Sequence, residues 1–268
     1  MSLFHLFGRS SSLLLKQTNS LPEIIYWGAK LNGPIDESLL DAISRPVPEA
    51  SLDEDVPLTL CPEASEGWFS SPGLEGNRAG KDWCPSFTAN ATLEGHSKLI
   101  VEAVDSRAEL ALILSVSLDE ASDVLTLQSK VTNLGEQAYN LQRLALTLPL
   151  PAYCDELLSL HGRWTKEFQQ HRQPLERGII SQENRRGRTS HQYFPGAIIG
   201  SKGFSHQVGE VFGFHFAWSG NHRIQSGVKT DGRRWLQAEE LLLSGEVRLA
   251  KGESYQTPEL MATYASTG

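Results

Sequence analysis

Apolar residues recur at every second position over residues 110–118, as leucine or valine, and the pattern returns over residues 125–131. A period of two is typical of a strand with one buried face, whereas an amphipathic helix repeats every 3.6 residues. The stretch 119–123 between the two runs is short and polar, so we expect them to pair as an antiparallel hairpin. Turn residues at 133–136 then predict a third strand over 144–150, which would complete a meander.

Strand-like runs bounded by Gly, Pro, Asn or Asp also occur at residues 24–27, 99–104, 211–218, 235–238 and 247–249. Only residues 36–43 predict a helix, because Asp36 can cap the first amides and the leucines that follow share a face with Ile43. Many short strands with little helix predict an all-β fold of stacked sheets, and we expect one domain over residues 1–268.

The net charge of -8 argues against a nucleic-acid partner, since the one basic run, at residues 185–188, is short. No stretch approaches the ~20 apolar residues of a membrane span, and residues 1–16 lack the features of a secretory signal. An odd number of cysteines without a CxxC pair favours reduced thiols at Cys61, Cys84 and Cys154. These features predict a cytoplasmic protein with no membrane contact.

The eight histidines show no HxxxH or HExxH spacing. Zinc sites in proteins are usually built on such spacings or on paired cysteines. We therefore expect neither a metal site nor a cofactor.

Five blocks of this chain occur in the same order as blocks of a known family. They are Ile25–Gly28 followed by Leu31, Asp55–Leu58, HGRWTKEFQQHR at 161–172, RRGRTSHQYFPGAIIG at 185–200 and GEVFGFHFAWSGNHR at 209–223. Together they resemble the N-terminal domain of the bacterial family-36 glycoside hydrolases, the α-galactosidases that cleave melibiose and raffinose. The resemblance covers almost the whole chain.

The resemblance implies a β-supersandwich of two large antiparallel sheets. It also implies that the catalytic (β/α)8 barrel is absent from this chain, so that the barrel is its partner and the parent enzyme is a homo-oligomer, a tetramer in the family. Retaining hydrolysis needs two carboxylates facing each other. The neighbouring acids Asp53 with Asp55 and Glu239 with Glu240 are not expected to supply them, and this chain alone is expected to be inactive.

In the family a loop of this domain helps to shape the galactose pocket, and the matching region here is Asp55 through Trp83. Its Gly and Pro residues predict a surface path without strand or helix. A sugar site needs an aromatic platform with charged partners, which predicts substrate contacts from Asp55, Trp68, Phe69, Arg78, Asp82 and Trp83. The chain departs from the family at Gly67–Ser70, where Trp and Ser replace an acidic and a basic residue, and Arg78 is the candidate replacement cation.

A second set, Arg188, His191, Trp218 and Asn221, is predicted to face the barrel as an interdomain interface. Alternatively, the arginine cluster ties strand ends together, and residues 218–221 form only a tight turn in which Asn221 takes an unusual backbone conformation. Two other functions stay open, a free-standing carbohydrate-binding module and a purely structural oligomerisation domain.

Overall fold

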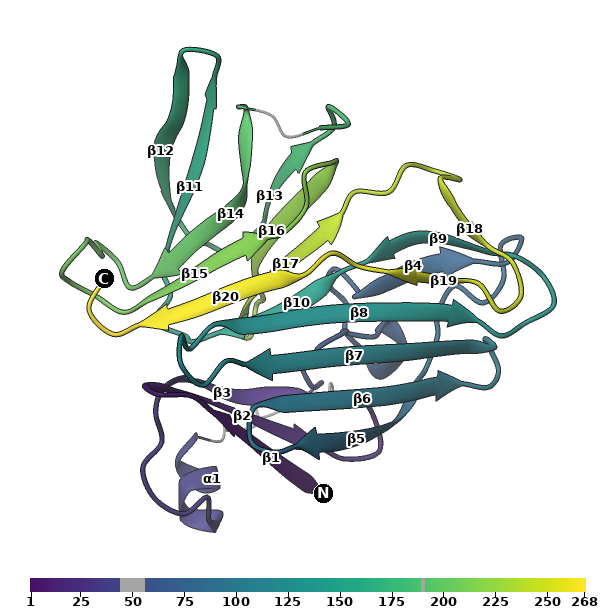
Figure 1. The fold of residues 1–268 in the computed structure, drawn as a ribbon, viewed down its shortest axis with the longest axis horizontal. Coiled ribbons are helices and arrows are strands. Elements are labelled where there is room, and N and C mark those ends of the chain that lie inside the picture. Colours follow the sequence, from purple (N-terminus) through teal and green to yellow (C-terminus); the bar gives the residue numbers. More distant parts are fainter. Residues whose placement is uncertain (44–55, 189–190) are drawn as a thin grey trace.

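The computed structural model describes residues 1–43, 56–188 and 191–268. Apart from the short helices α1 (Glu37–Ile43) and η1 (Ala64–Glu66), the regular elements of this part of the chain are antiparallel strands (Figure 1). The predicted all-β class is therefore confirmed. The described residues form four sheets, one large and three small, where two large ones were expected.

The large sheet has the order β12-β11-β14-β15-β20-β8-β7-β6-β5, and β19 pairs with β8 beside it. Its strands are β5 (Thr88–Glu94), β6 (Lys98–Asp105), β7 (Leu110–Leu118), β8 (Leu125–Asn133), β11 (Glu156–Arg163), β12 (Lys166–Pro174), β14 (Tyr193–Gly200), β15 (Val211–Phe216), β19 (Ser254–Gln256) and β20 (Leu260–Ala265). The predicted hairpin is present, since Leu110 pairs with Asn133 and Leu118 with Leu125. Alternate side chains of β7 and β8 are buried, as the period of two requires.

The predicted meander is wrong. Residues 139–150 form two strands in two other sheets, because β19 and β20 occupy the free edge of β8. One small sheet has the order β10-β17-β16-β13 and another β18-β9-β4. Their strands are β4 (Leu74–Asn77), β9 (Tyr139–Leu144), β10 (Leu146–Leu150), β13 (Gly178–Asn184), β16 (His222–Val228), β17 (Arg234–Glu240) and β18 (Val247–Leu249).

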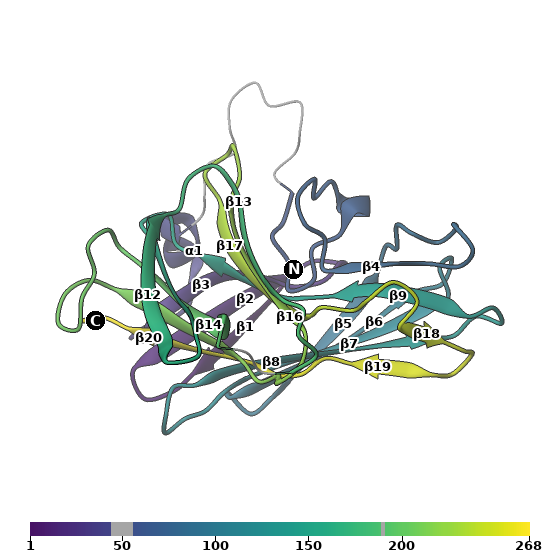
Figure 2. The same cartoon turned by 90° about the horizontal axis from the view of Figure 1, so that it is seen from above.

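The small sheets pack against the large one, which Figure 2 shows from a second side. The remaining sheet consists of β1 (Ser2–Phe7), β2 (Ser11–Gln17) and β3 (Glu23–Ala29). One hydrophobic core joins these layers, with members such as Leu13 of β2, Leu112 of β7, Leu148 of β10, Phe212 of β15 and Leu236 of β17. The residues of the candidate site that are described lie on connections between strands.

The predicted helix is confirmed as α1, and the Asp36 carboxylate accepts a hydrogen bond from the Leu39 amide at 3.0 Å. Within the described residues, no helix is long and apolar enough to cross a membrane. All three cysteines lie unpaired, with Cys61 and Cys154 buried.

Candidate functional site

Residues 56–83, called here the pocket segment, contain regular structure despite their Gly and Pro content. β4 pairs with β9 between Leu74 and Leu144, and Arg78 with Lys81 forms an isolated bridge at the turn that follows. Gly76 allows this pairing, because a Cβ there would lie 2.4 Å from the Tyr139 ring. The prediction of a surface path without strands is therefore wrong.

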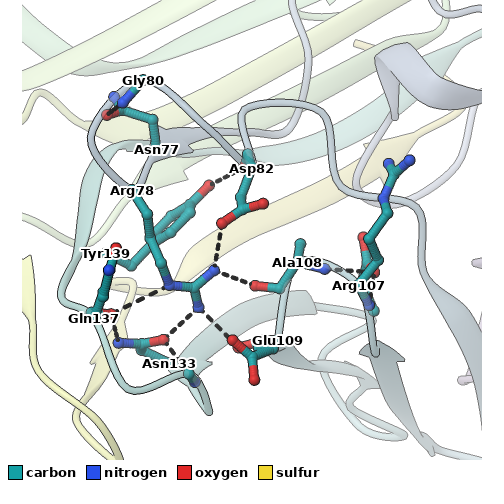
Figure 3. A network of polar contacts seen from close by, with 12 residues as sticks. Asn77, Arg78, Gly80, Asp82, Arg107, Ala108, Glu109, Asn133, Gln137 and Tyr139 are labelled. Atoms are coloured by element: carbon teal, nitrogen blue, oxygen red, sulfur yellow. Dashed lines mark hydrogen bonds and ion pairs between the residues drawn. The ribbon is translucent and has the colours of Figure 1, made fainter.

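Arg78 is buried, with 5% of its surface exposed, and its guanidinium is enclosed by protein (Figure 3). Each of its five N–H groups donates a hydrogen bond of 2.5–3.2 Å, to the carbonyls of Gln137, Ala108 and Glu109, the Asp82 carboxylate and the Asn133 side chain. The guanidinium carbon also lies over the Tyr139 ring, 5.4 Å from its centroid. Arginine has no further donor to offer a ligand. Arg78 is therefore a structural residue, which corrects the prediction that it contacts sugar.

Trp68 is also interior, with 1% of its surface exposed. Its ring packs with Leu58 and Trp235 in a small cluster of buried residues. Its indole N–H donates to the Ser71 carbonyl at 3.1 Å. The prediction that Trp68 is an accessible sugar platform is corrected in the same way.

Two aromatic rings of the pocket segment remain exposed, Phe69 by 83% and Trp83 by 68%. The Asp82 side chain, although paired with Arg78, is 30% exposed. These three keep the chemistry of the predicted sugar site, and their contact with substrate stays a prediction. Asp55 lies outside the described residues.

Glu63 is a buried acidic residue of the pocket segment that the sequence did not single out. Its carboxylate accepts the Phe87 amide at 2.8 Å, and its carbonyl accepts the Trp68 amide at 3.1 Å. The second carboxylate oxygen is buried without a hydrogen-bond partner. Burial raises the pKa of Glu63 from its ordinary 4.5 to about 7, and the Phe87 amide opposes this shift. The Glu66 and Asp105 carboxylates raise it further. An isolated glutamate between a proline and an alanine gives no local signal of burial.

The predicted interface residues lie just beyond the ends of β13, β14, β15 and β16. The Asn221 side chain accepts the Gly187 amide at 2.7 Å, and the Asn184 side chain donates to the carbonyls of Arg188 and Gly220 at 2.9 and 3.0 Å. His191 lies edge-on against Trp164, with centroids 5.5 Å apart. Asn221 has no positive φ, so the expected unusual conformation is absent there.

The hairpin β11–β12 adds exposed aromatic rings to this end of the fold. Trp164 is 73% exposed, and Phe168 is 64% exposed. Phe168 contacts Phe194 edge-on, with centroids 5.9 Å apart. Trp218 is 37% exposed.

The neighbouring acids Glu239 and Glu240 are each engaged by other side chains. Glu239 is 2% exposed and pairs with Arg143 at 2.7 Å and with Arg223 at 2.9 Å. Glu240 accepts the Tyr255 hydroxyl at 2.6 Å. In the described ranges no three His, Cys, Asp or Glu side chains are grouped to hold a metal ion.

Comparison with known proteins gives a consistent result. The model of the Glycosyl hydrolase family 36 N-terminal domain matches residues 20–250. The chain is 44% identical over 260 residues to the α-galactosidase of Escherichia coli, covering 96% of this chain and 36% of that relative. It is 31% identical over 165 residues to the α-galactosidase AgaA of Geobacillus stearothermophilus, covering 61% of this chain and 23% of AgaA.

Among solved structures, a variant of AgaA in complex with raffinose superposes with a TM-score of 0.86 at 23% identity. The superposition covers 100% of this chain and 41% of that structure, and at this identity it bears on the fold alone. The chain spans less than half the length of each of these relatives.

Proposed function

The chain belongs to glycosyl hydrolase family 36 as its N-terminal domain, and we propose that it is the non-catalytic part of a retaining α-galactosidase. The proposed substrates are terminal α-galactosyl residues of melibiose- and raffinose-type oligosaccharides. The observation that carries the proposal is the family match over residues 20–250, joined to 44% identity with an α-galactosidase. Raffinose bound to the structural relative AgaA supports the substrate class.

The proposed role of the pocket segment is to present Phe69, Trp83 and Asp82 to the galactose pocket of the assembled enzyme. Exposed aromatic rings stack on the C–H face of a sugar, and a carboxylate accepts its hydroxyls. Trp68 and Arg78 support this role from the interior.

The catalytic part of the proposal is tested on the chain alone with an aryl α-galactoside. We expect no turnover, because retaining hydrolysis needs two carboxylates about 5–5.5 Å apart that can reach the substrate. The Glu239 carboxylate is not available for this, since it pairs with Arg143 and Arg223. Turnover that persists through repurification and is lost on replacing a carboxylate of this chain would refute the proposal.

We further propose that Arg188, His191, Trp218 and Asn221 form an interface with the catalytic domain, and that the domain contributes to oligomer assembly. The exposed rings of Trp164, Phe168 and Trp218 support this. Monomeric proteins rarely expose large apolar patches.

Sedimentation of the chain at several concentrations tests the interface. We expect reversible association that weakens in Trp164→Ser, whereas Leu134→Ser, which changes another exposed apolar side chain, leaves it unchanged. A monomer at every concentration speaks against an apolar interface at this end.

A further inference from the structure

Phe69 lies between two fixed points. On one side, Trp68 is buried, and on the other, the Ser71 carbonyl accepts two hydrogen bonds, from the Trp68 indole at 3.1 Å and from Gln237 at 3.0 Å. An exposed ring with anchored neighbours loses less conformational freedom when it binds than a ring on a loose loop. The 83% exposure of Phe69 therefore does not mean that its backbone is free.

The orientation of the Gln237 amide is set by charge. Gln237 lies on β17 with 1% of its surface exposed, and its oxygen accepts from the Arg143 guanidinium at 3.0 Å. The amide nitrogen then faces Ser71 and Thr147, at 3.0 Å from each acceptor. A flipped amide would set its NH2 group against the guanidinium, which has only donors. Arg143 is itself fixed by Glu239.

Trp68 has a second restraint from the turn between β16 and β17. The ammonium of Lys229 lies 4.3 Å from the centroid of the Trp68 ring, and the guanidinium of Arg233 lies 5.3 Å from it. Cations over an indole face are attracted by its quadrupole. Both anchors of Phe69 therefore come from β17 and the turn that precedes it.

We propose that Gln237 and Lys229 are positioning residues for Phe69, which hold it in one orientation toward the galactose pocket. The inference rests on the proposed function of the pocket segment and deepens it. Burying the Arg143–Glu239 ion pair removes both charges from water, and this desolvation can cancel the attraction between them. In some proteins, buried ion pairs instead serve to fix one specific conformation. Here the pair orients the amide that holds Ser71.

The positioning claim is tested on this chain by the exchange of the Trp68 indole N–H with solvent, followed by NMR. We expect two- to tenfold faster exchange in Gln237→Ala and in Lys229→Gln, the scale of one hydrogen bond or cation contact. The matched control is Gln225→Ala. Gln225 pairs with Gln237 in the sheet and also accepts from Arg143, at 2.8 Å, but its amide nitrogen donates to Ser181 rather than to Ser71. Wild-type exchange in both test variants, or equal acceleration in the control, overturns the proposal.

A kinetic test uses a chimera in which this chain replaces the 260 residues of the E. coli enzyme to which it aligns. We expect Gln237→Ala and Phe69→Ala to raise KM by a similar two- to tenfold factor with little change in kcat. If Phe69→Ala leaves KM unchanged, the proposed pocket role fails, whatever the exchange data say. If Phe69→Ala raises KM while Gln237→Ala and Lys229→Gln do not, the pocket role stands and the positioning claim fails.

Discussion

Replacing Arg78 by alanine is expected to lower the free energy of unfolding by about 3–5 kcal/mol, the scale of breaking a buried ionic network. The substitution removes five hydrogen bonds and leaves the Ala108, Glu109 and Gln137 carbonyls without their cationic donor. Whole domains are stable by only about 5–15 kcal/mol, so the variant should unfold at much lower urea concentration.

Arg107→Ala is the matched control for Arg78. Arg107 is exposed, and its guanidinium makes one long hydrogen bond, of 3.3 Å, to the Cys84 carbonyl. We expect Arg107→Ala to lower the free energy of unfolding by less than about 1 kcal/mol. If Arg78→Ala were as stable as Arg107→Ala, the polar network of Figure 3 would not stabilise the pocket segment. The prediction that Arg78 contacts sugar would then be open again.

Glu63→Gln is expected to change the pH dependence of stability. The pKa of Glu63 is raised in the folded protein, so the folded state binds more protons than the unfolded state between pH 4.5 and about 7. Wild-type stability therefore falls as the pH rises through this window, by up to about 3 kcal/mol from this group. Glutamine removes the titration, and the stability of the variant relative to wild type should increase by that amount between pH 4.5 and pH 8.

Urea unfolding at the two pH values measures this difference, with Glu66→Gln as the control. Glu66 is an exposed glutamate three residues away, and its carboxylate is a smaller cause of the raised Glu63 pKa than burial is. Its replacement should therefore reduce the pH dependence only slightly. A pH profile of Glu63→Gln that parallels wild type would contradict the burial argument for Glu63.

Local pattern was sufficient to predict the hairpin of β7 and β8 and the cap of α1. The alternation over residues 110–131 predicted β7 and β8 with their pairing, since a short polar turn joins them and a slip by one residue would expose the buried face. Asp36 was predictable because capping involves only the next few residues. The pairing of residues 146–150 could not be predicted in this way, because their partner strand, β17, lies far along the chain.

Local sequence pattern also could not predict which residues of the pocket segment are buried. Gly and Pro around Trp68 and Arg78 indicate a surface loop, yet Trp68 packs on Trp235, and Arg78 donates to Asn133 and Ala108. These partners come from distant segments, and only the assembled sheets bring them within contact. What local composition predicted correctly was the exposure of Phe69 and Trp83.

We propose that this chain supplies the N-terminal domain of an α-galactosidase and no catalytic group. The most direct test compares aryl α-galactoside turnover by the chain alone, by the E. coli enzyme lacking its matching 260 residues, and by the chimera that joins the two. We predict turnover by the chimera and none by the chain alone, with the truncated enzyme much less active than the chimera. Turnover by the chain alone, or a folded chimera no more active than the truncated enzyme, would contradict this proposal.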